Sequence, residues 1–131
     1  MTAPAPTALP AVPTTPDGQW VPACPAERLL PERGVAVLLP CGGQAALFRT
    51  HDGTLYALDN IDPFSGAAVM SRGIVGDRAG EPTVASPMLK QVFSLRTGVC
   101  LDDPQVRLAT HRVREHDGAV QVSARPAGES R

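Results

Sequence analysis

Three short turns built on glycine divide this chain into brief apolar segments, and this division is the feature that most constrains its fold. The turns are Gly42-Gly43, His51-Asp52-Gly53 and His116-Asp117-Gly118. Asp-Gly supplies the positive φ values that two-residue hairpin loops require, and apolar residues alternate on either side of it. Strands joined by such turns pair with their neighbours in an antiparallel meander. The sequence therefore predicts an all-β fold, a small antiparallel sandwich or barrel of short strands.

The expected strands are short and begin near Trp20. They cover residues 20–23, 34–39, 44–49, 54–58, 81–85, 92–95, 106–115 and 119–124. The first contains Pro22, which cannot donate a hydrogen bond to a central strand pair, so it is expected at a sheet edge. Residues 60–77 contain one proline and three glycines and are expected to form a single long loop. Loops of that length inside a compact domain are usually functional or disordered.

The two ends of the chain differ from its body in composition. Residues 1–17 are rich in Pro, Ala and Thr, and such a segment cannot bury enough apolar area to offset the entropy of ordering it. We expect a disordered tail at 1–17, one domain at 18–124 and a flexible C-terminus at 125–131. Hydrophobic residues make up 43% of the chain, which is enough for one small core.

Charge and hydropathy exclude several classes of partner. The formal net charge is −1 and the sequence has no cluster of lysines or arginines, which excludes a nucleic-acid footprint and a polybasic membrane patch. No apolar run approaches the roughly 20 residues of a membrane-spanning helix. The first residues lack the basic start and the apolar centre of a signal peptide. We therefore expect a cytoplasmic protein that binds neither membrane nor nucleic acid.

The cysteines and histidines do not form a metal-binding motif. The cysteines are Cys24, Cys41 and Cys100, and the histidines are His51, His111 and His116. The cysteines are odd in number and widely spaced, so we expect reduced, mostly buried thiols that act as small hydrophobes. The histidines lie beside turns or charges, and we expect all three at the surface.

Two segments of the chain match one another in sequence. They read Asp62-Pro63-Phe64-Ser65-Gly66 and Ser86-Pro87-Met88-Leu89-Lys90. They resemble the two cluster-binding loops of a Rieske domain, which read Cys-Pro-His and Cys-Pro-x-His. A Rieske centre holds a [2Fe–2S] cluster with two thiolates and two imidazoles. The resemblance puts Asp62, Phe64, Ser86 and Leu89 at the four ligand positions, so we interpret the chain as a Rieske-like domain with a vestigial cluster site at two loop tips.

The residues at these four positions do not suit a metal. Phe64 and Leu89 have no lone pair to donate. The oxygens of Asp62 and Ser86 alone fall short of the six or more ligands that Ca²⁺ takes. We therefore expect no metal in this chain. Asp and Ser side chains can instead cap nearby backbone N–H groups, and we favour that role over contact with a partner protein.

Residues 20–123 resemble the small subunit of assimilatory NADH-dependent nitrite reductase, a Rieske-like family. Besides the two matching segments, the resemblance is carried by Trp20-Val21-Pro22, residues 48–60, Ser71-Arg72-Gly73-Ile74-Val75-Gly76-Asp77 and residues 93–101. It implies a non-catalytic accessory subunit that binds a large catalytic subunit, which reduces nitrite to ammonium with NADH. The resemblance places FAD, a [4Fe–4S] cluster and sirohaem in that large subunit, and no cofactor and no catalytic residue in this chain.

The sequence leaves two alternative functions open, and it also leaves open the role of the apolar side chains at the loop tips. The chain could be a Rieske-type ferredoxin that carries electrons to an oxygenase, although the missing ligands count against it. It could also be a β-sandwich interaction module unrelated to nitrite. Phe64, Met88 and Leu89 bring apolar side chains to the loop tips, where they either form a small local core or dock the large subunit.

Overall fold

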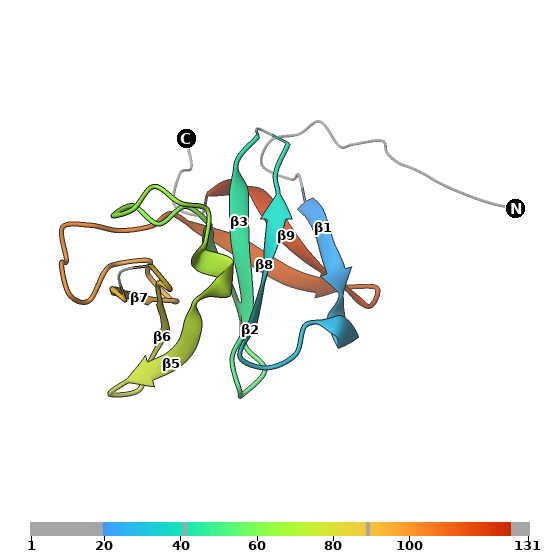
Figure 1. The fold of residues 1–131 in the computed structure, drawn as a ribbon. Helices are drawn as coiled ribbons and strands as arrows, with labels where there is room; N and C mark the ends of the chain where they lie inside the picture. Colours follow the sequence, from blue (N-terminus) through green and yellow to red (C-terminus); the bar gives the residue numbers. More distant parts are fainter. Residues whose placement is uncertain (1–19, 41, 89, 127–131) are drawn as a thin grey trace, which may run out of the picture.

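The computed structural model describes residues 20–40, 42–88 and 90–126, and in these residues the protein is built almost entirely of antiparallel strands (Figure 1). The strands are β1 (Trp20–Pro25), β2 (Arg33–Leu38), β3 (Gln44–Arg49), β4 (Leu55–Asp59), β5 (Ile74–Arg78), β6 (Glu81–Ala85), β7 (Val92–Ser94), β8 (Thr110–His116) and β9 (Ala119–Pro126). Two short 3₁₀ helices, η2 (Ala26–Arg28) and η3 (Met70–Arg72), complete the described elements. The predicted all-β fold is confirmed. The tail expected at 1–17 lies outside the described residues.

The strands form two sheets. The larger has the order β1-β9-β8-β4-β3-β2, and the smaller has the order β5-β6-β7. In Figure 1 the small sheet lies to one side of the large one. The predicted hairpins β2–β3, β3–β4 and β8–β9 are all present. In the last of these, Asp117 and Gly118 have φ values of 54° and 80°, as a type I′ turn requires. β1 lies at an edge of the large sheet, where Pro22 was expected.

The expectation of one long loop over 60–77 was wrong. Residues 74–78 form β5, which pairs with β6 through a turn at Ala79-Gly80 with φ values of 54° and 90°. The backbone N–H of Gly80 donates to Asp77 Oδ2 at 3.0 Å and closes that turn. Most of β5 is exposed, including Ile74 at 69%. A strand at a sheet edge needs no buried apolar alternation, so its sequence gives little sign of it.

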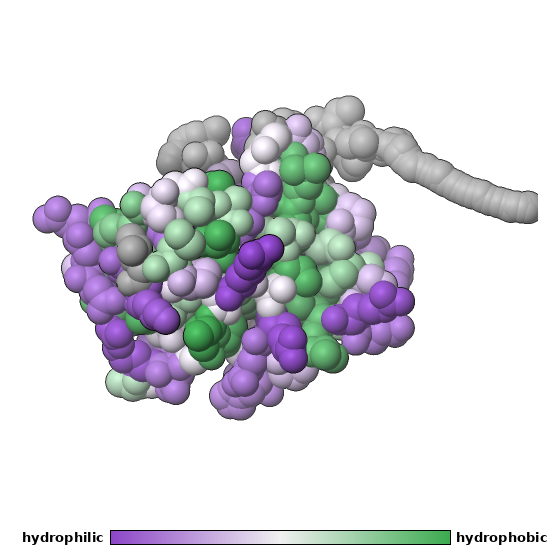
Figure 2. All heavy atoms as spheres, in the orientation of Figure 1, coloured by the Kyte–Doolittle hydropathy of each residue, from purple (hydrophilic) through white to green (hydrophobic). Residues whose placement is uncertain are grey.

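Two hydrophobic clusters lie on opposite faces of the large sheet. Alternate residues of β3 divide between them, since Ala46 and Phe48 belong to one cluster and Ala45 and Leu47 to the other. The first cluster fills the space between the two sheets and consists of Ala46, Phe48, Leu58, Met70, Val84, Phe93, Leu95, Cys100 and Leu108. The second packs under β1 and η2 and consists of Leu29, Val37, Leu39, Ala45, Leu47, Ala57, Val120 and Val122. In Figure 2 polar residues gather over the lower turn between β3 and β4, and apolar residues lie over the upper end of β2.

The segment before β5 bridges the two sheets at very short range. A Cβ atom on Gly34 of β2 would lie 2.4 Å from the Ser71 carbonyl oxygen, and one on Gly73 would lie 2.6 Å from the Ala85 carbonyl oxygen. Only glycine allows approaches this close. The buried Asn60 side chain fixes the segment further, because its Oδ1 accepts from the Ser71 N–H at 2.7 Å. These contacts fix the distance between the two sheets at this point.

One histidine does not lie where the sequence suggested. His111 is only 6% exposed, so the prediction of a surface position was wrong for it. Its Nε2 lies 3.1 Å from Asp59 Oδ1, and its Nδ1 lies 3.0 Å from the Ser123 carbonyl oxygen. Cys100 is buried and Cys24 half-buried, and both are free thiols. Neither described helix has the length and apolar character needed to span a bilayer.

Candidate functional site

The first of the two matching segments forms a closed loop in which one residue organises the others. The Asp62 N–H donates to the Ala67 carbonyl at 2.8 Å, and the Gly66 N–H donates to the Asp62 carbonyl at 2.7 Å. The Asp62 side chain caps the loop from inside, because its Oδ1 accepts from the Phe64 N–H at 2.8 Å. Gly66 has a φ of 77°, in the left-handed region. These bonds define a five-residue loop tip that the backbone holds closed.

The second segment repeats the same three bonds. The Ser86 N–H donates to the Gln91 carbonyl at 2.9 Å, and the Lys90 N–H donates to the Ser86 carbonyl at 3.0 Å. Ser86 Oγ accepts from the Met88 N–H at 3.2 Å. The fifth residue is again left-handed, with a φ of 66° at Lys90. The similarity of the two sequences is therefore a similarity of backbone structure.

A buried hydrogen bond joins the two loops. Ser86 Oγ donates to Asp62 Oδ2 at 2.5 Å, across 24 residues of sequence. Asp62 is fully buried and Ser86 is 1% exposed. Each oxygen of the Asp62 carboxylate has a donor, and the Ser86 hydroxyl both donates and accepts. Buried polar groups are normally satisfied in this way, so the pair forms a complete link between the loops.

The hydrogen bond from Ser86 also favours the ionised form of the Asp62 carboxyl group. Burial raises the pKa of this carboxyl, but the hydrogen bonds from the Ser86 hydroxyl, the Phe64 N–H and Ser65 together outweigh burial and leave the pKa below its ordinary value of 3.8. Hydrogen bonds donated to a carboxylate favour its ionised form. Asp62 is therefore an anion at neutral pH, held by neutral donors.

The apolar side chains of the two loops lie in different surroundings. Phe64 is half-buried and packs against the first core cluster, with its ring centroid 6.2 Å from that of Phe93. Met88 is 51% exposed. Leu89 lies outside the described residues. The structure thus brings Asp62 and Ser86 together, directs Phe64 toward the core and leaves Met88 largely in solvent.

This arrangement does not fit a Rieske cluster. The cluster requires two thiolates and two imidazoles, whereas the positions here carry a carboxylate and a hydroxyl that bond to one another, a phenyl ring and an isobutyl group. Among the described residues there is no group of three or more His, Cys, Asp or Glu side chains that could hold a metal ion. Among the described residues, hydrogen bonds and the packing of Phe64 on Phe93 hold the two loops in shape.

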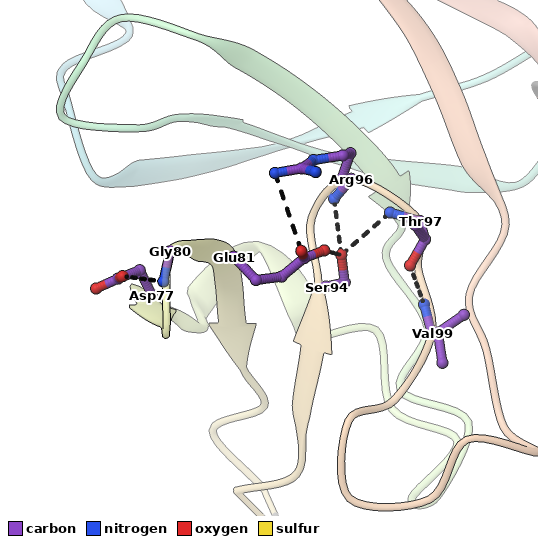
Figure 3. Close-up of polar contacts among 7 residues, drawn as sticks. All are labelled: Asp77, Gly80, Glu81, Ser94, Arg96, Thr97 and Val99. Atoms are coloured by element: carbon purple, nitrogen blue, oxygen red, sulfur yellow. Dashed lines mark hydrogen bonds and ion pairs between the residues drawn. The ribbon is translucent and has the colours of Figure 1, made fainter.

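A third loop of the same kind follows β7. The sequence suggests a turn at Arg96-Thr97-Gly98, but the likeness of this loop to the other two was not expected. The Ser94 N–H donates to the Val99 carbonyl at 2.9 Å, and the Gly98 N–H donates to the Ser94 carbonyl at 2.8 Å. Ser94 Oγ accepts from the N–H groups of Arg96 and Thr97 at 3.1 and 3.2 Å. Figure 3 shows this hydroxyl between those amides and Glu81, to whose carboxylate it donates. A Ser or Asp followed four residues later by Gly is the signal that could have identified it.

Comparison with known proteins identifies the family. Residues 19–123 match the Rieske-like [2Fe-2S] domain. The small subunit of nitrite reductase (NADH) from Escherichia coli K12 is 42% identical over 105 residues, which are 79% of this chain and 96% of that protein. A crystal structure from Mycobacterium tuberculosis, assigned as an NADH-dependent nitrite reductase small subunit, superposes with a TM-score of 0.76 at 56% identity, over 79% of this chain and 92% of that one.

A third relative is much longer than this chain. The large subunit of nitrite reductase [NAD(P)H] from Klebsiella oxytoca is 38% identical over 118 residues, which cover 90% of this chain but only 12% of that protein. A domain of this kind therefore also occurs inside a single large-subunit polypeptide. The matched family, the loop geometry and these relatives agree, and the chain belongs to the Rieske-like family of small subunits of NADH-dependent nitrite reductases.

Proposed function

We propose that this chain is a non-catalytic accessory subunit of an assimilatory NADH-dependent nitrite reductase and that it acts by binding the large catalytic subunit. The observation that carries the proposal is the buried hydrogen bond between Ser86 and Asp62. This bond holds the two loops in the arrangement of a Rieske-like domain, although the residues that would bind iron are absent. A domain preserved in this way is suited to binding a partner and not to carrying electrons.

The identity of the partner is supported by the Klebsiella oxytoca relative. There a segment similar to this chain is part of the polypeptide named as the large subunit, so the two parts are held together covalently. In this protein we propose that the same association is noncovalent. FAD, the [4Fe–4S] cluster and sirohaem then belong to the large subunit, where nitrite is reduced to ammonium. The complex is proposed to be cytoplasmic.

The ferredoxin alternative is disfavoured by the residues themselves. An electron carrier of this fold needs ligands for its cluster, and the phenyl ring of Phe64 packs on Phe93 where an imidazole would be required. The alternative of an interaction module unrelated to nitrite is disfavoured by the identity to nitrite reductase small subunits. We therefore propose that no residue of this chain is catalytic.

The second loop is the better candidate for the docking surface. The Phe64 side chain already packs against the first core cluster. Met88 exposes 51% of its surface and is accessible to a partner. Methionine is enriched at protein interfaces relative to the rest of the surface. We propose that Met88 contacts the large subunit, and Leu89 remains a candidate for the same contact. Residues 18–124 are the proposed binding unit, and residues 1–17 are proposed to be dispensable for it. Arg125 and Pro126 are part of β9 and are proposed to be needed for the fold.

Co-expression with the large subunit tests the proposal. A tagged large subunit should retain this chain through affinity and size-exclusion steps at a fixed ratio, and NADH-dependent nitrite reduction should be higher or longer-lived with the chain than without it. Failure of the two proteins to co-purify, together with unchanged activity, would refute the proposed function.

A further inference from the structure

The three matching loops differ at one position in a way that the fold does not require. The fifth residue is left-handed in each, with φ values of 77° at Gly66, 66° at Lys90 and 81° at Gly98. Glycine adopts this conformation without a steric penalty, whereas a lysine is strained by its Cβ atom. The second loop therefore carries a side chain at a cost that the other two loops avoid.

No contact within the described fold compensates for this strain. The backbone N–H of Lys90 closes the loop on the Ser86 carbonyl, but glycine would supply the same N–H. The side chain is exposed, and its ammonium group forms no hydrogen bond or ion pair with any described residue. Strained backbone positions cluster at functional sites. Glu32, Ala79 and Asp117 are also left-handed in this fold, so the strain at Lys90 indicates a function only together with its surroundings.

The surroundings of Lys90 indicate what that function is. The carboxylate of Asp62 belongs to the same pair of loops, but it is buried and both of its oxygens already have donors. Met88, two residues away, is exposed. The second loop tip therefore presents one unpaired cation beside an apolar side chain. Lys90 is also the only lysine in the sequence.

We propose that Lys90 forms an ion pair with a carboxylate on the large subunit and that Met88 supplies the apolar contact beside it. This inference rests on the proposed function, and it adds the chemistry of the surface on the partner: an acidic group next to an apolar patch. The unpaired positive charge favours an acidic surface over a basic one. The occurrence of a similar domain within the Klebsiella oxytoca large subunit favours that subunit as the occupant.

A pair of glycine substitutions separates strain from charge. Ala79, in the turn between β5 and β6, is the matched control because it is also left-handed, with a φ of 54°, and exposed. Lys90→Gly and Ala79→Gly should both relieve strain and raise the melting temperature, by roughly 4 °C. Only Lys90→Gly should weaken binding to the purified large subunit, by about tenfold or more in Kd. A variant that folds better but binds worse cannot be explained by misfolding.

Charge is then tested directly. Lys90→Arg should bind within about threefold of the unchanged chain, and raising the salt concentration should weaken binding of the unchanged chain more than that of Lys90→Gly. Equal affinities for the unchanged chain and Lys90→Gly would overturn this inference and leave the proposed function standing. A lower melting temperature for Lys90→Gly would also overturn it, because the side chain would then be structural. Absence of any binding by the unchanged chain would refute the proposed function itself.

Discussion

The hydroxyl of Ser86 donates a 2.5 Å hydrogen bond to the carboxylate of Asp62, and neither side chain reaches solvent. These two residues stand at the positions where the resemblance to a Rieske domain expects the two cysteines. Where a Rieske domain joins its two loops through four metal bonds, these two loops are joined by one charge-assisted hydrogen bond. Charge-assisted hydrogen bonds are about twice as strong as neutral ones, so this link is expected to contribute measurably to stability.

Removing the donor of this bond should destabilise the fold. Ser86→Ala leaves Asp62 Oδ2 buried without a partner, which costs about 2 kcal/mol and should lower the melting temperature by roughly 8 °C or more. Thermal unfolding followed by circular dichroism measures the change. Ser71→Ala is the control, because the Ser71 hydroxyl bonds to no described residue and its loss should cost less than about 0.5 kcal/mol. Equal melting temperatures for the two variants would contradict the role of the link.

The link should also make stability depend on pH in the acid range. The pKa of Asp62 is lower in the folded state than its ordinary value of 3.8, so the unfolded chain binds the proton more tightly. The stability that ionised Asp62 contributes is therefore fully present above about pH 4, and it is lost as the pH falls through the pKa of Asp62 in the folded state. Asp62→Asn should lower the free energy of unfolding at pH 7, and the difference from the unchanged chain should shrink below pH 4. Urea unfolding from pH 7 to pH 3 tests this.

The same experiment separates Asp62 from a second acidic group. The hydrogen bond from the Thr50 hydroxyl and that from the Thr54 N–H lower the pKa of Asp52 to about 2. This group is present in both the unchanged chain and the Asp62→Asn variant, so its effect cancels in the difference. A difference that stays constant from pH 7 to pH 3 would show that Asp62 does not titrate in the expected range.

Phe64 and Met88 should respond in opposite ways to truncation. Phe64→Ala removes a half-buried ring from the first core cluster and should cost about 2 kcal/mol of stability. Met88→Ala removes a side chain that is 51% exposed, so it should leave stability within about 0.5 kcal/mol but weaken binding to the large subunit. Chemical unfolding and a pull-down with the large subunit measure the two effects. Unchanged binding by Met88→Ala would exclude Met88 as an anchor.

The purified chain should carry no iron–sulfur cluster. The reason is the set of side chains at the four ligand positions, which offers neither thiolate nor imidazole. After anaerobic expression in an iron-supplemented medium, metal and sulfide analysis should find far less than one cluster per chain, with no visible absorption band. Iron and sulfide near two atoms of each per chain, the content of a [2Fe–2S] cluster, would overturn the interpretation of the loops as vestigial.

Deletion of residues 1–17 should leave the fold intact, since a Pro/Ala/Thr-rich segment contributes no core. The melting temperature of the shortened chain should differ from that of the full chain by less than about 4 °C, the shift expected from roughly 1 kcal/mol in a domain of this size. A larger fall would show that this segment packs on the domain.

Local chemistry explains what the sequence predicted well. The turn at Asp117-Gly118 was predicted because its φ values depend only on those two residues. The capping roles expected of Asp62 and Ser86 were also local, and both capping bonds are present. In each case the prediction needed no knowledge of where distant segments lie.

Distant pairings explain what the sequence missed. β5 has no apolar alternation of its own and is a strand because β6 lies beside it. His111 is buried because Asp59, 52 residues away, and the Ser123 carbonyl both bond to its ring. The bond between Ser86 and Asp62 likewise depends on two loops being brought together by the sheets. Each of these features depends on which distant segments the fold brings together. A local sequence pattern does not contain that information.

The single lysine has a practical consequence for labelling chemistry. A reagent that modifies ε-amino groups meets one target in the whole sequence, and that target stands on the second loop. A fluorophore attached there by reductive alkylation, which keeps the amine positively charged, reports on one point of the surface. The second loop can therefore be labelled through its native lysine side chain, without introducing a cysteine.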